Sequence, residues 1–261
     1  VVETNWCVTL DRVPEELYRE IAANERQREE WVRLFAIDKI EGDLTQPGYS
    51  EPLTIEFLNA NQSLVLDTAH FDGGFKDRLL ASFDDLDEQT DGLLIHSENF
   101  QALNLIAASY RGRVRCVYID PPFNTESDQF AYKDTYRSSS WACLMRDRLV
   151  LGRGMLTEDG LFHVHVDHNS NTLARHLLDD TFGSERFLNE IVWRIGWVSG
   201  YKTMADRYVR NHETIFIFSK SSAYFFNKEA ARIPYVSKSS SSLAGAISSA
   251  RQTFGLESRR M

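Results

Sequence analysis

Residues 114–125 read VRCVYIDPPFNT, an apolar run that ends in a carboxylate, two prolines and an aromatic ring. The apolar run predicts a buried β-strand over residues 114–119. Two consecutive prolines end a strand and stiffen the backbone, so Asp120 and Phe123 are expected to be held at its carboxyl end. Ligands of parallel α/β sheets bind at that end. This stretch therefore predicts both a fold class and the place of a site.

Strands and helices alternate on either side of this stretch, after Gly92. We expect strands at 93–96, 114–119, 161–166, 187–194 and 213–218, and helices at 99–110, 141–156 and 171–182. Helical segments of this length between strands are typical of α/β proteins with a parallel sheet. The sequence therefore predicts an α/β fold with a partial Rossmann-like sheet, doubly wound and mostly parallel.

Residues 1–90 have a different character and are predicted to form a mainly helical accessory region. Pro14 is expected to open a helix that runs to Ile21, and residues 25–35 carry apolar side chains at helical spacing. The polar stretch 84–92 separates this region from the alternating pattern. Residues 237–261 begin with serines and small residues and are predicted to be a flexible tail.

Composition excludes several classes of protein. The 261 residues are 43% hydrophobic and 26% charged, which argues against a disordered acidic tail, a collagen-like rod or a disulfide scaffold. The three cysteines form no Cys-x-x-Cys pair, which argues against a cysteine zinc site. No apolar run is long enough for a membrane span and no secretory signal is recognisable, so we expect a cytoplasmic protein.

Charge is distributed unevenly along the chain, whose net charge is −9. Acidic residues dominate residues 1–100, whereas basic residues outnumber acidic ones from Trp193 onward. A local basic surface attracts phosphate backbones. On charge alone, a solvated basic face explains the pattern equally well.

The residues after the predicted strand suit an exocyclic base amine. The Asp120 carboxylate and the Pro121 carbonyl accept hydrogen bonds and can hold the two N–H groups of an NH2, while Phe123 stacks on the base. Accepting both hydrogens draws the nitrogen lone pair out of conjugation with the ring and makes it nucleophilic. The alternative is a structural turn in which Phe123 fills a gap in the core.

Residues 117–125 resemble the catalytic motif of amino-methylating DNA methyltransferases (the N-4/N-6 DNA methylase family), in the form found in modification subunits of type III restriction-modification systems. Four further segments are similar to segments of that family and follow in its order: 94–103, 141–156, 159–167 and 212–220. The resemblance covers residues 93–220, about half of the chain. It implies that 91–192 is the catalytic half of a methyltransferase domain and that 193–236, with its strand 213–219, begins the target-recognition region.

The resemblance implies S-adenosylmethionine as the methyl donor and the N6 amine of a flipped adenine in duplex DNA as the acceptor. An aspartate that opens the motif favours adenine over cytosine within the family. The implied partners are double-stranded DNA, a second copy of the chain in a homodimer, and a restriction subunit with endonuclease and helicase functions.

The resemblance also implies roles for individual residues, and no metal ligand is assigned. The implied catalytic residues are Asp120, Pro121, Pro122 and Phe123. The implied cofactor-binding residues are Glu98, Asn99 and Asp120. The implied DNA-binding residues are Asn124, Arg194, Lys202, Arg207 and Arg210.

The chain departs from the family at the donor site. Ser97 stands where the family usually has glycine, and the Phe-x-Gly-x-Gly loop that approaches the donor is not found after the variable segment. Together with the first residue, Val1, and the serine-rich end, this predicts a fragment or a truncated relative. The sequence therefore leaves open whether this chain transfers a methyl group on its own.

Two other functions compete with this interpretation. His163, His165, Asp167 and His168 spell the His-x-His-x-Asp-His pattern of zinc-dependent hydrolases, and strand periodicity would put the first three on one face. We prefer to interpret these histidines as partly buried strand residues satisfied by hydrogen bonds. The other alternative is a non-catalytic DNA-binding or assembly remnant of a methylase, in which only the scaffold is kept.

Overall fold

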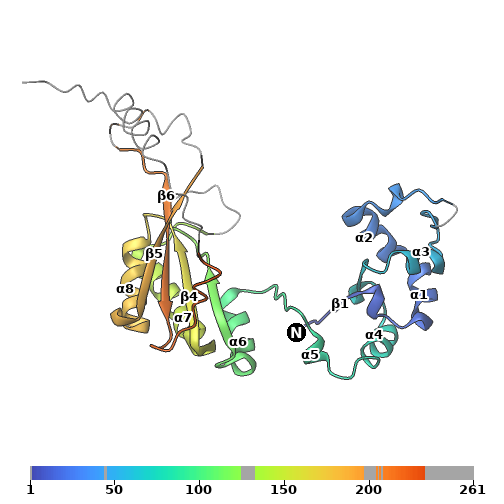
Figure 1. Ribbon diagram of the computed structural model, residues 1–261, viewed down its shortest axis with the longest axis horizontal. Coiled ribbons are helices and arrows are strands. Elements are labelled where there is room, and N and C mark those ends of the chain that lie inside the picture. The colour runs from blue at the N-terminus through green and yellow to red at the C-terminus, as the bar shows by residue number, and fades with distance from the viewer. Residues whose placement is uncertain are drawn as a thin grey trace, which may run out of the picture. The chain divides into compact units, whose positions relative to one another are not determined.

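The computed structural model describes residues 2–43, 46–124, 133–196, 204, 206 and 208–232. The chain divides into two compact units, Val1–Leu94 and Ile95–Met261 (Figure 1). Among the described residues, none of the helices combines the length and the apolar character needed to cross a membrane.

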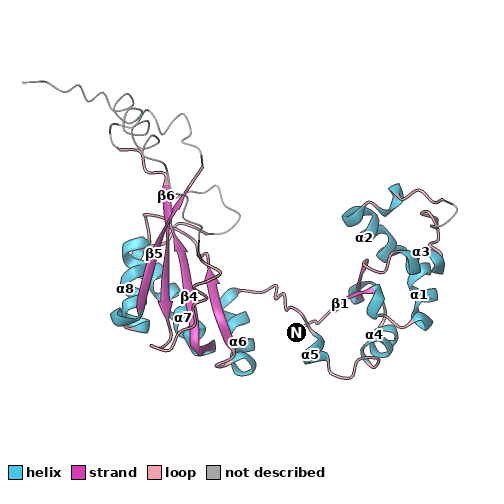
Figure 2. Cartoon of the chain, viewed as in Figure 1, coloured by secondary structure: helices cyan, strands magenta, loops and turns pink. Residues whose placement is uncertain are grey.

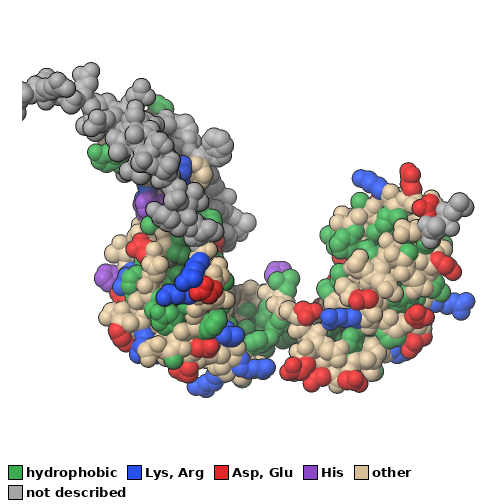
Figure 3. Space-filling model, viewed as in Figure 1, with side chains coloured by type: hydrophobic (Ala, Val, Ile, Leu, Met, Phe, Trp, Pro, Cys, Tyr) green, Lys and Arg blue, Asp and Glu red, His purple; other side chains and the backbone are tan. Residues whose placement is uncertain are grey.

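The N-terminal unit is built from short helices and one small antiparallel ribbon (Figure 2). The ribbon pairs β1 (Cys7–Thr9) with β2 (Val65–Asp67). The helices are α1 (Tyr18–Ala23), α2 (Glu25–Phe35), α3 (Ile55–Ala60), α4 (Gly73–Leu80) and α5 (Leu86–Gln89), with 3₁₀ turns η1 (Leu10–Arg12), η2 (Glu15–Leu17), η3 (Ile37–Lys39) and η4 (Thr68–His70). The helix expected from Pro14 is split into η2 and α1, whereas α2 has the predicted bounds. Acidic side chains are prominent on the visible face of this unit (Figure 3).

Capping and burial explain how α2 forms and how it is held in this unit. The Asn24 side chain accepts a hydrogen bond from the Gln27 N–H and so caps the helix, and Ala36 ends it in a left-handed conformation with φ of 52°. Trp31 is fully buried, and its indole N–H donates to the Val65 carbonyl at 2.6 Å. This bond fastens α2 to β2.

The second unit carries the motif predicted to be catalytic and is called the catalytic unit for that reason; it contains a four-stranded mixed sheet. Its elements are α6 (Asn99–Tyr110), β3 (Val114–Ile119), α7 (Ser138–Met155), β4 (Leu156–Val166), α8 (Asn171–Phe182), η5 (Ser184–Arg186), β5 (Phe187–Arg194) and β6 (His212–Ser219). The strand order is β3-β4-β6-β5. The first pair is parallel and the other two are antiparallel, so the expected mostly parallel, doubly wound sheet is wrong in its strand directions. β5 and β6 are consecutive strands of the chain and lie side by side in the sheet, an arrangement in which antiparallel pairing is usual.

One core holds this sheet to its helices. On β4 the even-numbered side chains Phe162, Val164 and Val166 are buried, and they pack with Trp141 of α7 and Phe182 of α8. The odd-numbered side chains of β4, which include His163 and His165, lie on the opposite face and are partly buried. The alternation predicted from the sequence therefore decides which side chains of β4 are available near the catalytic motif.

The strand expected at residues 93–96 is not formed. This segment has no strand assignment, and Leu94 is 97% exposed. In the described part of the chain, β3 is one of the two outer strands of its sheet, α6 buries none of its side chains, and Tyr118 on β3 is 55% exposed. A short apolar run forms a strand only where a neighbour accepts its backbone hydrogen bonds, and residues 93–96 have no such neighbour here.

Candidate functional site

The catalytic motif lies where β3 ends. Because β3 and β4 run parallel, their carboxyl ends meet at one edge of the sheet. The buried Trp141 of α7 donates its indole N–H to the Pro122 carbonyl at 2.7 Å. A side chain of the core of the catalytic unit therefore holds this loop in place. The sequence predicted the loop but gave no sign that Trp141 would anchor it.

Asn124 closes the same loop. Its backbone N–H donates to the carboxylate of the buried Asp134 at 2.7 Å, and its side-chain oxygen accepts from the Tyr136 N–H at 2.6 Å. Its φ of 58° lies in the left-handed region, which asparagine tolerates better than most residues. The structure thus gives Asn124 a loop-closing position, and its predicted DNA contact remains a prediction.

Three polar side chains form a hydrogen-bonded chain beside Phe123. The Tyr118 hydroxyl lies 2.9 Å from His165 Nδ1, and His165 Nε2 lies 2.8 Å from a carboxylate oxygen of Glu213. Partial burial, and then the negative charges of Asp120 and Glu213, raise the pKa of Tyr118. Because the Glu213 carboxylate only accepts, the tautomer that fits has its proton on Nε2, and Nδ1 then accepts from the Tyr118 hydroxyl. The His165 and Phe123 rings are 5.7 Å apart between centroids. Sequence reasoning missed this group because its members are joined only by sheet pairing.

The histidines of β4 do not assemble as a zinc-hydrolase site. His163 and His165 share a face as predicted, but His163 Nδ1 lies 3.3 Å from the Val117 carbonyl and 3.7 Å from Cys116 Sγ. Burial lowers the pKa of His163, which favours the neutral ring. Asp167 accepts hydrogen bonds from the backbone and side chain of Asn169. In the described ranges no cluster of possible metal ligands includes these residues, and the interpretation as hydrogen-bonded strand residues fits the geometry.

Glu98 is placed at the start of α6, where it already has partners. Its carboxylate caps the helix by accepting from the Gln101 N–H at 3.0 Å, and it pairs with Arg148 of α7 at 2.6 Å. The backbone hydrogen bonds from Phe100 and Gln101, followed by the charge of Arg148, lower the pKa of Glu98. Asn99 is the exposed first residue of α6. Glu98 therefore joins two helices, and the structure adds no further support for donor binding by either residue.

Two of the predicted DNA-binding residues, Arg194 and Arg210, lie at one end of the β5–β6 pair. Arg194 ends β5 and pairs in register with His212, two residues after Arg210. Both arginines are exposed, as are Trp193 and Tyr208 nearby in the sequence. Lys202 and Arg207 lie outside the described residues.

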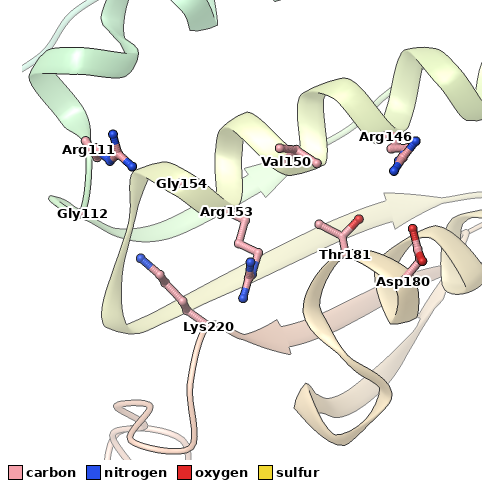
Figure 4. A pocket seen from close by; sticks show the side chains of 9 residues that line it. All are labelled: Arg111, Gly112, Arg146, Val150, Arg153, Gly154, Asp180, Thr181 and Lys220. Carbon is pink, nitrogen blue, oxygen red and sulfur yellow. The ribbon is translucent and has the colours of Figure 1, made fainter.

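A basic cavity of about 520 Å³ lies elsewhere in the catalytic unit (Figure 4). Its lining includes Arg111, Arg146, Arg153, Lys220 and Asp180. Lys220 donates to the Leu156 carbonyl at 2.6 Å, which places it at the amino end of β4. The catalytic loop follows the carboxyl end of β3, so this cavity is separate from the candidate site.

Several known proteins are similar to this chain in sequence. The Mod subunit of the probable type III restriction-modification enzyme HindVI from Haemophilus influenzae is 35% identical over 141 residues, which are 52% of this chain and 18% of that protein. The type II methyltransferase M.EcaI from Enterobacter cloacae is 31% identical over 140 residues, covering 51% and 30% of the two chains. The EcoP15I Mod subunit from Escherichia coli is 24% identical over 159 residues, covering 49% and 24%. The chain thus spans less than a third of each of these relatives.

Solved structures give matches of low TM-score. The M1.HpyAVI–SAM complex matches with a TM-score of 0.37 and 15% identity, over 54% of this chain and 61% of that one. The cytosine-N4-specific PvuII DNA methyltransferase matches with a TM-score of 0.39 and 16% identity, over 61% and 62%.

A protein-family model covers the catalytic motif and the sheet that carries it. Residues 114–255 match the N6/N4 methyltransferase family model, which is described as DNA methylase. The match spans more than half of the chain and begins at the first residue of β3. It confirms the resemblance seen in the motif, and this chain belongs to the N6/N4 DNA methylase family.

Proposed function

We propose that this chain is the amine-binding part of an adenine-N6 DNA methyltransferase, which uses S-adenosylmethionine within a type III-like restriction-modification system. The observation that carries the proposal is the motif at residues 120–123, held at the end of β3 by the bond from Trp141 to the Pro122 carbonyl. Family membership supports it, and relatives named as type III Mod subunits favour that system.

The loop's hydrogen-bond inventory indicates how it would hold the base. The Pro122 carbonyl already accepts from Trp141, so the Asp120 carboxylate and the Pro121 carbonyl are left as acceptors for the two amine hydrogens. The double proline fixes their separation, and Phe123 would stack on the base. The Asp120 carboxylate is then also placed to receive the proton that the amine loses on methylation.

The Tyr118–His165–Glu213 chain would position Phe123. His165 is fixed from both ring nitrogens, by Tyr118 and by Glu213, so its ring is a rigid surface beside the Phe123 ring. A side chain locked in this way lowers the entropy cost of stacking a flipped base on its neighbour. We therefore assign His165 a positioning role rather than a catalytic one.

The described residues suit the amine that accepts the methyl group better than they suit the methyl donor. Glu98, the candidate for the donor's adenosine, is occupied by the Gln101 N–H and Arg148, and the sequence has no Phe-x-Gly-x-Gly loop after β6. The proposal is that the chain alone transfers methyl groups poorly or not at all, and this same observation favours the non-catalytic remnant as the second candidate.

DNA is the proposed partner of the basic end of the β5–β6 pair. Arg194 and Arg210 would contact phosphates, and the exposed Trp193 and Tyr208 offer stacking surfaces. A homodimer and a restriction subunit are proposed as further partners by analogy with the Mod relatives.

Binding to mismatched duplexes tests the amine site without requiring methyl transfer, because a mismatched base flips at lower cost. Fluorescence anisotropy would compare duplexes that differ in one unpaired adenine, cytosine or thymine. We expect tightest binding to the adenine duplex, a preference lost in Asp120→Ala and kept in His176→Gln, whose side chain is exposed on α8. Equal affinity for adenine and thymine would refute the amine site, and a preference for cytosine would refute the adenine assignment.

A further inference from the structure

The N-terminal unit contains a cluster of possible metal ligands that the proposed function does not use. Glu30 of α2, Asp67 at the end of β2 and His70 at the end of η4 each offer one ligand atom, and these atoms lie within 4.8 Å of one another. All three side chains are partly buried. The three residues come from three elements, and the fold therefore brings them together.

The spacing is close to that of a zinc site. His70 Nε2 lies 2.9 Å from Glu30 Oε2. Two ligands on a tetrahedral zinc ion, with bonds of about 2.0–2.1 Å, are about 3.3 Å apart. A small opening of the His70–Glu30 contact would thus admit an ion. Arg33 pairs with the other Glu30 oxygen, Oε1, and leaves Oε2 directed at His70.

A second set of bonds holds the ligands in place. Gln27 is fully buried; its side-chain oxygen accepts from the Asp67 N–H at 2.7 Å, and its amide nitrogen lies 3.4 Å from Glu30 Oε2. Asn24 donates to the His70 carbonyl at 3.0 Å. Outer bonds of this kind orient metal ligands and are a usual part of metal sites. They fasten α2 to the segment that supplies the other two ligands.

A soft donor lies beside the cluster. Cys7 of β1 is paired in register with Asp67 of β2, so the two side chains are on the same face of the ribbon.

We propose that Glu30, Asp67 and His70 bind one divalent transition-metal ion of the zinc type, with water completing the coordination. Two carboxylates neutralise the charge of the ion, and an imidazole selects this class over magnesium or calcium, which take oxygen ligands. The ion would join α2 to β2 and η4. Its role would be structural, since an ion that binds only the folded unit stabilises it by mass action.

Isothermal titration of the full chain with zinc chloride, under reducing conditions, tests the site. We expect one ion per chain and at least a tenfold loss of affinity in His70→Gln and in Asp67→Asn. Both variants keep a hydrogen-bonding side chain, and circular dichroism would verify that they fold. His176→Gln, which removes an exposed histidine in the other unit, should bind zinc as the wild type does.

Thermal unfolding is an independent test of zinc binding. Zinc should raise the apparent Tm of the wild type by a few degrees and leave that of His70→Gln unchanged. Equal zinc affinity in the wild type and His70→Gln would overturn the proposal, as would no binding by the wild type. Magnesium binding as tight as zinc binding would overturn the assignment of the metal class.

Discussion

The two units differ in how far their helices and strands are buried. In the N-terminal unit α2 packs Trp31 at full burial and is bonded to β2 at Val65. The catalytic unit closes a similar core around Trp141, yet α6 buries no side chain and Tyr118 on the outer strand β3 is 55% exposed. The predicted catalytic motif therefore follows a partly exposed outer strand, and its rigidity comes from the hydrogen bond to Trp141 of α7.

Removal of the two buried tryptophan side chains should have the largest effects on the free energy of unfolding. Trp31→Ala and Trp141→Ala each leave a large cavity and should cost about 3–5 kcal/mol of unfolding free energy. Each loss should be confined to its own unit, because the two side chains lie in separate cores. Hydrogen exchange followed by mass spectrometry would assign the loss to peptides of one unit. Loss of protection in both units from either variant would contradict the separation.

Two glycines of α7 give a smaller, matched comparison within the catalytic core. A Cβ at Gly152 would lie 2.7 Å from the Phe162 ring, whereas a Cβ at Gly154 would meet nothing within 4 Å. Gly152→Ala should therefore cost about 1–3 kcal/mol by overpacking. Gly154→Ala should be neutral or stabilise by up to about 1 kcal/mol. Urea unfolding measures both, and equal effects at the two positions would contradict the packing of α7 on β4.

Conservative substitutions of the same tryptophans separate the effect of their hydrogen bonds from the effect of their packing. Trp31→Phe and Trp141→Phe keep most of the ring but lose the bonds to the Val65 and Pro122 carbonyls, at a cost of about 1 kcal/mol each. Only Trp141→Phe should also weaken the preference for a mismatched adenine, because only it frees the catalytic loop. An unchanged preference in Trp141→Phe would show that the loop does not depend on this anchor.

The smallest expected effect is a pH dependence specific to the catalytic unit. Burial lowers the pKa of His163 below its ordinary value of 6.5, so the unfolded chain binds a proton at a higher pH than the folded one. His163 therefore contributes stability above about pH 6.5 that is lost as the pH falls toward the lowered pKa. The slope of stability against pH in this window should be shallower in His163→Gln, and an equal slope would exclude the effect.

Local patterns predicted most elements but not their partners. Periodicity and capping residues located α2, α6, α8, β3 and β5 at their observed bounds. The same reasoning placed a strand at 93–96, because an apolar run does not reveal whether a neighbouring strand is present. It also expected parallel strands where β6 returns antiparallel between β4 and β5, since strand direction depends on connections rather than on composition.

The candidate site was likewise predicted only in part. The motif at residues 120–123 could be found because its residues are consecutive. The residues that hold this motif in place could not be found in the same way. Trp141 and the Tyr118–His165–Glu213 group lie up to 95 positions apart in the sequence and meet only through packing and strand pairing. Periodicity placed His163 and His165 on one face, and hydrogen bonds were expected to satisfy them, but only the fold identifies the hydrogen-bond partners.

We propose above all that this chain binds the methyl-accepting base of a DNA methyltransferase but lacks a complete site for the methyl donor. Calorimetric titration of the full chain with S-adenosylmethionine tests it most directly, with Asp120→Ala as the comparison. We predict no saturable binding to either protein, together with the adenine preference of the wild type toward mismatched duplexes. Saturable binding to the wild type that is lost in Asp120→Ala would contradict the claim and show that the donor site is already present.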